Sequence, residues 1–176
     1  MWKLAPCPDD FAETARFHFD NEAIVCGTPA EVFDVVASIE HEANWFPDFK
    51  EARWLTTEAG GVGADRDYRL TYMRLLEHFT IWERGSRLRF WVSECSLPLI
   101  RRFLEDYHFA PAGDGKTRFR WRVAYEPLPL LRPLHPLLRP LFARDFRRAT
   151  ANLVGYCERL YGGKRSQAPA RPPVSA

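Results

Sequence analysis

The chain has 176 residues, of which 46% are hydrophobic and 14% aromatic, which is enough for one domain with a sizeable core. Its formal net charge of +2, with 27% charged residues, gives no general reason to expect a nucleic-acid or anionic-membrane partner. The four cysteines are widely spaced and form no C-x-x-C pair, so the sequence favours neither a zinc site nor a disulfide framework.

The N-terminal quarter predicts one strand followed by two short helices. Residues 1–14 contain two prolines and two adjacent aspartates, and we expect an irregular lead-in there. Residues 15–26 begin with alternating aromatic and polar side chains, which is typical of a strand. The Thr-Pro-Ala-Glu sequence at 28–31 is a capping box with proline at the first helical position, so a helix begins here. A second short helix must end by Phe46, because the residue before a proline avoids the helical conformation.

After Pro47 the apolar period changes to two, which predicts a series of strands. Glycine-rich turns separate several of them, so neighbouring strands pair antiparallel. The last strand is the clearest, because its aromatic and aliphatic residues alternate strictly with arginines. The predicted strands are 51–57, 64–72, 76–84, 87–93, 103–110 and 117–126.

The C-terminal third predicts one long helix. Five prolines in 127–140 exclude a single uninterrupted helix, so we expect an extended or broken approach to the helix there. Apolar residues in 140–161 then recur at steps of three and four, and this amphipathic helix would cover the apolar face of the sheet. Residues 15–161 would form one domain, and the weakly hydrophobic segment 162–176 would be a flexible tail. We expect a cytoplasmic protein, because the first ten residues lack the apolar region of a signal peptide.

Several short motifs occur along the chain in a characteristic order. They are Thr-Pro-Ala-Glu-Val-Phe-Asp-Val at 28–35, Trp-Phe-Pro at 45–47, Trp-Glu-Arg-Gly-Ser-Arg-Leu-Arg-Phe at 82–90, Thr-Arg-Phe-Arg-Trp at 117–121 and Leu-Val-Gly-Tyr at 153–156. In this order they resemble the START-like (SRPBCC) superfamily, and most closely its polyketide cyclase/dehydrase-like branch. The resemblance implies an α+β helix-grip fold, in which a curved antiparallel sheet of about seven strands wraps around the C-terminal helix. It also implies an apolar ligand between sheet and helix.

Other kinds of site are poorly supported by the sequence. Gly115-Lys116-Thr117 looks like the end of a P-loop, but the pattern requires glycine where Ala110 stands and a helix where a strand follows. The five histidines lack the spacing of metal ligands, so we expect no metal and no cofactor. Arginines and aromatic residues interleave in 118–125, but they lie on opposite faces of the strand, so we expect no nucleic-acid partner.

The inward faces of the predicted strands supply candidate site residues. Strand alternation, together with the helix-grip arrangement, predicts these ligand contacts: Trp45, Tyr68, Tyr72, Phe79, Phe90, Tyr107, Trp121, Tyr125 and Phe146. Ordinary core packing is the alternative role for each of them. The same alternation places Glu94 and Glu105 on the inward faces of their strands. Burial would raise the pKa of either carboxyl group and suit it to general acid or base catalysis.

These observations leave two functions open. The first is binding or transport of a hydrophobic small molecule such as a lipid, polyketide or isoprenoid. The second is a polyketide cyclase or dehydratase-like reaction that uses a cavity carboxylate or tyrosine. The sequence predicts no oligomeric state, and its leucine-rich and proline-rich segment 128–141, with Arg132 and Arg139, is a weaker candidate for membrane contact. We favour binding, because the sequence contains no convincing catalytic pair.

Overall fold

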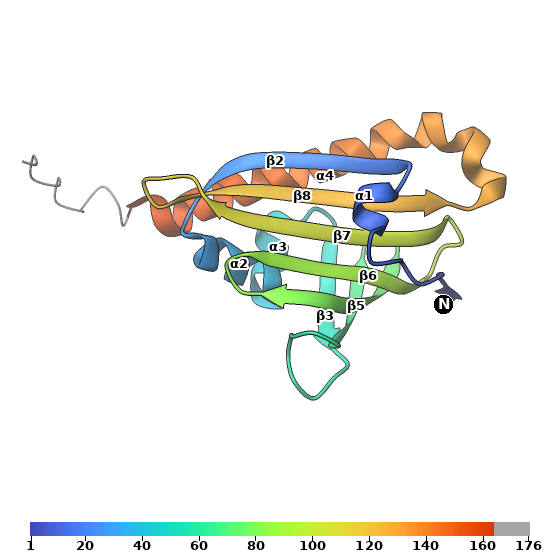
Figure 1. Ribbon diagram of the computed structural model, residues 1–176, viewed down its shortest axis with the longest axis horizontal. Coiled ribbons are helices and arrows are strands. Elements are labelled where there is room, and N and C mark those ends of the chain that lie inside the picture. Colours follow the sequence, from blue (N-terminus) through green and yellow to red (C-terminus); the bar gives the residue numbers. More distant parts are fainter. Residues whose placement is uncertain (164–176) are drawn as a thin grey trace, which may run out of the picture.

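The computed structural model describes residues 1–163, apart from the side chain of residue 138, and consists of a curved sheet that wraps along one long helix (Figure 1). The strands are β1 (Trp2–Lys3), β2 (Phe17–Cys26), β3 (Phe49–Trp54), β4 (Asp65–Leu70), β5 (Arg74–Glu83), β6 (Arg87–Cys95), β7 (Ile100–Pro111) and β8 (Lys116–Pro127). The helices are α1 (Phe11–Thr14), α2 (Pro29–Ala37), α3 (Ile39–Trp45) and α4 (His135–Cys157), with a 3₁₀ helix, η1 (Pro129–Leu134), and a π-helix, η2 (Glu158–Gly162). The predicted α+β helix-grip fold is confirmed.

The sheet is antiparallel, with the strand order β2-β8-β7-β6-β5-β4-β3 and with β1 paired to the end of β6. Hairpins link β3 through β8 in sequence order, as the period-two pattern predicts. One further pair joins β2 to β8 along the full length of β2, from Phe17 opposite Tyr125 to Cys26 opposite Lys116, so that β2 is an edge strand. This long-range pairing brings the first long strand alongside the last, and β2 runs next to α4 (Figure 1).

The capping box starts α2 as predicted. The Thr28 hydroxyl accepts a hydrogen bond from the Glu31 amide at 3.4 Å, and the Glu31 carboxylate accepts one from the Thr28 amide at 2.7 Å. These two bonds satisfy backbone donors that the first helical turn leaves free. Helix α2 then buries Val32, Phe33 and Val36 against the sheet.

The C-terminal helix begins five residues earlier than the sequence predicts. The prediction starts the helix at Pro140, whereas α4 begins at His135 and contains Pro140. Pro136 occupies the first turn, where no backbone donor is needed, and Pro140 removes only one hydrogen bond near the same end. The predicted interruption of the helix lies between η1 and α4, so the segment that leads to α4 is itself helical. At the other end η2 extends the helical path to Gly162, and the rest of the predicted tail lies outside the described residues.

The main core lies between the concave face of the sheet and the helices. Helix α4 contributes Ala149, Leu153 and Cys157, all with no exposed surface. On the opposite face of the sheet α1 covers a smaller apolar cluster. Within residues 1–163, no helix is both long enough and apolar enough to cross a bilayer.

Candidate functional site

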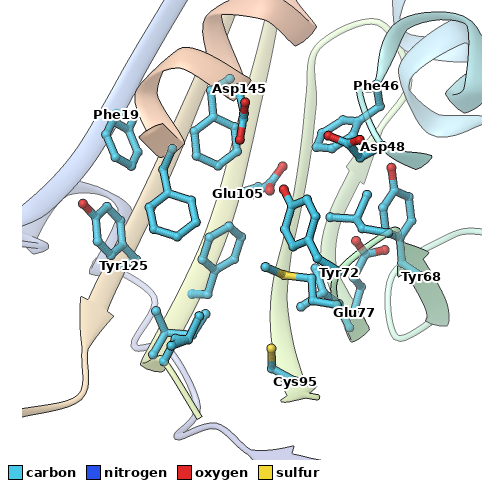
Figure 2. A pocket seen from close by; sticks show the side chains of 18 of the residues that line it. Phe19, Phe46, Asp48, Tyr68, Tyr72, Glu77, Cys95, Glu105, Tyr125 and Asp145 are labelled. Atoms are coloured by element: carbon cyan, nitrogen blue, oxygen red, sulfur yellow. The ribbon is translucent and has the colours of Figure 1, made fainter. Parts of the chain in front are cut away.

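A cavity of about 140 Å³ remains between the concave face of the sheet and the helices α3 and α4. Figure 2 shows its side chains converging from several strands and from the helical elements. Its lining is predominantly apolar and includes Phe19, Phe46, Leu70, Leu75, Phe90, Leu99, Ile100, Phe103, Phe142 and Phe146. The polar groups that line it include two buried clusters; Asp48, Tyr72, Asp145 and the hydrogen-bonded pair of Tyr125 and His135 line it separately.

The first polar cluster is centred on Arg66, whose side chain is only 4% exposed. Its Nε atom donates to Glu77 Oε2 at 2.6 Å, and its Nη1 atom donates to Glu42 Oε1 at 3.4 Å. The Tyr68 hydroxyl donates to the other Glu42 oxygen at 3.3 Å. Strands β4 and β5 and helix α3 thus meet at one buried cation.

Aromatic rings surround the same guanidinium. Its central carbon lies 5.0 to 6.0 Å from the ring centroids of Trp54, Tyr68, Phe79 and Phe90. Cation–π attraction is strongest when the cation is desolvated, as it is here. The arginine is therefore held by charge and by packing at the edge of the cavity.

The second polar cluster is centred on Glu105. Tyr107 Oη and Trp121 Nε1 both donate to Glu105 Oε2, the latter at 3.0 Å. Within residues 1–163, no donor reaches Oε1. In Figure 2 this carboxyl group lies between the rings of Phe19 and Tyr125 on one side and Tyr68 and Tyr72 on the other.

Burial changes the charge of these carboxyl groups. Desolvation raises the pKa of Glu42 to about 8, although the Arg66 charge opposes this rise. Desolvation also raises the pKa of Glu105 to about 8, and the Tyr107 hydrogen bond opposes it. The pKa of Glu77 is raised too, but its 2.6 Å contact makes it the natural ion-pair partner of Arg66. Near neutral pH the two buried clusters therefore contain one ion pair and two uncharged carboxylic acids.

The raised pKa values of Glu42 and Glu105 predict that stability falls as the pH rises. Between the unfolded pKa, near 4.5, and the folded pKa, near 8, the folded chain keeps two protons that the unfolded chain releases. Their stabilising contribution is complete below the unfolded pKa and is lost as the pH rises through the folded value. Each tenfold difference in proton affinity between the two states corresponds to about 1.4 kcal/mol. Urea unfolding measures the fall in the free energy of unfolding between about pH 5 and about pH 8. This fall should be much smaller in E42Q/E105Q than in the wild type, while E51Q, an exposed control, should match the wild type. An equal change in the free energy of unfolding with pH in all three proteins would contradict these raised pKa values.

The structure places most of the predicted ligand contacts along the cavity. Trp45, Tyr68, Tyr72, Phe90, Tyr107, Tyr125 and Phe146 line it. Tyr72 is 47% exposed, because it follows β4 in the turn to β5 at the edge of the cavity. Phe79 and Trp121 are fully buried, contact cavity residues through their rings and do not themselves line the cavity.

The structure brings only one of the two predicted acid–base candidates to the cavity. Glu105 lines the cavity, but the strand alternation that places Glu94 inward is wrong. Leu76 lies opposite Glu94 and Glu77 lies opposite Val92, so Ser93 is an extra residue in β6. This β-bulge reverses the alternation, and Cys95 takes the inward position. Glu94 instead lies opposite Lys3 of β1.

The sequence patterns do not predict the Arg66 cluster as part of the site, although the spacing of its residues is partly informative. Arg66 precedes Tyr68 by two residues, and Glu77 precedes Phe79 by two. Alternation therefore places Arg66 and Glu77 on the same inward faces of their strands as those aromatic residues. Glu42 lies three residues before Trp45 on α3, which places both on one face of the helix. Within the described residues, no three His, Cys, Asp or Glu side chains come together as a metal site.

Comparisons with known proteins agree with this geometry. A family model described as polyketide cyclase / dehydrase and lipid transport matches residues 16–158. An uncharacterized protein of Mycobacterium tuberculosis is 31% identical over 152 residues, which cover 84% of this chain and 89% of that protein.

Solved structures share the fold at low sequence identity. The ZhuI aromatase/cyclase from Streptomyces sp. R1128 aligns with a TM-score of 0.69 at 12% identity, over 81% of this chain and 94% of that one. TTHA0849 from Thermus thermophilus aligns with a TM-score of 0.67 at 18% identity, over 82% and 99%. A START superfamily protein from Mycobacterium smegmatis aligns with a TM-score of 0.65 at 14% identity, over 81% and 98%. The chain therefore belongs to the polyketide cyclase / dehydrase and lipid transport family, and it shares its fold with the START superfamily protein from Mycobacterium smegmatis.

Proposed function

We propose that the chain binds and carries a hydrophobic small molecule, of the lipid, polyketide or isoprenoid type, in the cavity between sheet and α4. The observation that carries this proposal is the unfilled, mostly apolar space of about 140 Å³ in an otherwise packed core. A dry apolar cavity of about 150 Å³ holds a benzene-sized molecule. The cavity thus suits one ring or part of an alkyl chain, and a larger ligand would extend toward Tyr72.

Filling this cavity tests the proposal. Leu75 lines the cavity and is 8% exposed, so an indole at this position would occupy the space that the ligand needs. Leu75→Trp should weaken binding of the neutral fluorescent probe N-phenyl-1-naphthylamine by about tenfold or more, as measured by fluorescence titration.

Leu55→Trp is the matched control, because Leu55 is 49% exposed and does not line the cavity. This variant should bind the probe like the wild type, and circular dichroism should show that both variants fold. Unchanged binding in folded Leu75→Trp, or failure of the wild type to bind the probe, would contradict the proposal.

A cyclase or dehydratase-like reaction is the second candidate, and the position of Glu105 supports it. With a pKa of about 8, this carboxyl group is protonated near neutral pH and lines the cavity. It could donate its proton to a substrate carbonyl oxygen as a carbon nucleophile attacks, or to a departing hydroxyl group. The hydrogen bonds from Tyr107 and Trp121 would then stabilise the carboxylate that remains.

A pair of isosteric probes tests whether Glu105 donates to a ligand. The wild type should prefer 2-acetylnaphthalene over 2-isopropenylnaphthalene by about fivefold below pH 8, because only the ketone oxygen accepts a hydrogen bond. The preference should disappear above that pH. Glu105→Gln should keep a preference that does not depend on pH, since an amide donates throughout, whereas Glu42→Gln should retain the wild-type pH dependence. A preference that titrates equally in Glu105→Gln would exclude Glu105 as the donor.

Membrane contact through 128–141 stays a prediction. Leu130, Leu137 and Leu141 are 87%, 73% and 60% exposed, so they are available for such a contact. Leu131 is not, because it lines the cavity.

A further inference from the structure

A second pocket, of about 310 Å³, lies between α4 and the edge strand β2. It is lined by His18, Phe19, Asp20, Asn21, Arg139, Ala143 and Arg147. Unlike the first cavity, it is open and rich in cationic and hydrogen-bonding side chains. We propose that this pocket binds an oxyanion, either a phosphate or a carboxylate group.

The cationic side of the pocket comes from one stripe of α4. Arg139, Ala143 and Arg147 follow each other at intervals of four residues, so they lie on one face of the helix. The small Ala143 leaves space between the two guanidinium groups. Arg139 packs over the Phe19 ring at 5.3 Å, and within residues 1–163 neither arginine has a carboxylate partner. The site thus has two positive charges without a counter-ion.

The acidic residue that borders the pocket does not neutralise these charges. Asp20 accepts two hydrogen bonds from Arg122 of β8, at 2.6 and 3.0 Å. These bonds hold the pKa of Asp20 below its usual range. The Asp20 charge is therefore already balanced by a guanidinium from the neighbouring strand.

Asn21 provides an independent indication of a ligand. Its side chain borders the pocket and is 6% exposed, and its Nδ2 atom is buried with no acceptor among the described residues. A buried donor of this kind destabilises the fold unless an acceptor reaches it. β2 also has only one neighbouring strand, so its outer edge offers further backbone N–H groups. An oxyanion supplies the acceptors that these donors lack.

The oxyanion could come from two sources. Phe19 lines both pockets, so the anionic end of an amphipathic ligand could reach Arg139 while its apolar part occupies the first cavity. That source rests on the proposed function. A free oxyanion is the other source and does not depend on it.

Titration with inorganic phosphate, followed by NMR of the isotope-labelled full chain, tests the site itself. The expected result is a saturable shift of the Asn21 side-chain amide and of the Arg147 Nε–H signal. Arg147→Gln should weaken this binding about fivefold. Arg148→Gln is the matched control, because its side chain is exposed on the same helix but does not line the pocket. Uniform, unsaturable shifts of the surface arginines would mean an adventitious ion only and would overturn the inference.

Dodecyl phosphate and dodecanol then separate the two sources. If the anionic end of a cavity ligand occupies the site, dodecyl phosphate should bind more tightly than dodecanol, and Arg147→Gln should remove the difference. If only free phosphate binds, the two probes should bind alike, and the phosphate titration alone supports the site. If dodecanol binds in the first cavity while neither phosphate probe perturbs Asn21, the oxyanion site is wrong and the proposed function stands. If phosphate binds at Asn21 and dodecanol does not bind, the site stands and the proposed function fails.

Discussion

Replacing Arg66 with methionine is expected to lower the free energy of unfolding by about 3–5 kcal/mol near neutral pH. Methionine keeps much of the length of the side chain but removes the charge that lies 2.6 Å from Glu77 and 3.4 Å from Glu42. Glu77 would then carry a buried charge without a cation, and Glu42 would lose a hydrogen-bond donor. The loss should shrink as the pH falls toward 5, because protonated carboxyl groups need no counter-ion. Urea unfolding followed by circular dichroism measures both effects.

Arg69→Met is the matched control for this prediction. Arg69 lies on the same strand and pairs with Glu51 at 3.2 Å, but the two side chains are 62% and 69% exposed. An exposed pair of this kind contributes about 0–1 kcal/mol. If Arg66→Met and Arg69→Met cost the same, or if the cost at Arg66 does not depend on pH, the buried ion pair does not hold β4, β5 and α3 together.

Truncating Leu153 to alanine should lower the free energy of unfolding by about 2–5 kcal/mol. Leu153 is fully buried in α4, in the main cluster that joins the helix to the sheet. Leu153→Ala would leave a void that the surrounding strands cannot close completely. Thermal or urea unfolding measures the loss.

Leu141→Ala provides the comparison on the same helix. Leu141 is 60% exposed, so its truncation should change stability by no more than about 0.5 kcal/mol. A similar small effect for Leu153→Ala would mean that α4 is not packed on the sheet in solution, and the cavity between them would not exist.

Local patterns were sufficient to predict most elements of the fold. The capping box starts α2, and alternation in β8 correctly separates its buried aromatic face from its arginine face. These signals are reliable because each depends on residues within one turn of helix or one strand. The pairing of β2 with β8 spans about a hundred residues, so no local pattern predicts it.

The errors in the site have equally specific causes. The bulge at Ser93 reverses the alternation of β6, and no residue in the sequence of that strand marks it. Arg66 and Glu77 lie opposite each other in the hairpin of β4 and β5, but the contact of Arg66 with Glu42 requires α3 to pack on this hairpin, which no local pattern predicts. Alternation predicts which side chains point inward, but whether they fill the core or leave a space depends on their packing in three dimensions.

The two buried clusters also divide the cavity into different chemical environments. The Arg66 cluster keeps its charge within an ion pair and under aromatic rings, whereas Glu105 lines the cavity with an oxygen that no donor among residues 1–163 reaches. Both clusters line the cavity, and we expect the first to stabilise the structure and Glu105 of the second to contact a ligand. If Glu105 donates to a ligand, as proposed, the cavity should discriminate between a hydrocarbon and a ketone of the same shape.

The most direct measurement is the set of intermolecular NOEs between N-phenyl-1-naphthylamine and the methyl groups of the isotope-labelled chain. If the ligand occupies the space between sheet and α4, the probe protons should show NOEs to Leu70, Leu75 and Ile100, which line the cavity. NOEs confined to the exposed leucines Leu130, Leu137 and Leu141 would show that the probe binds to the surface, and they would contradict the account.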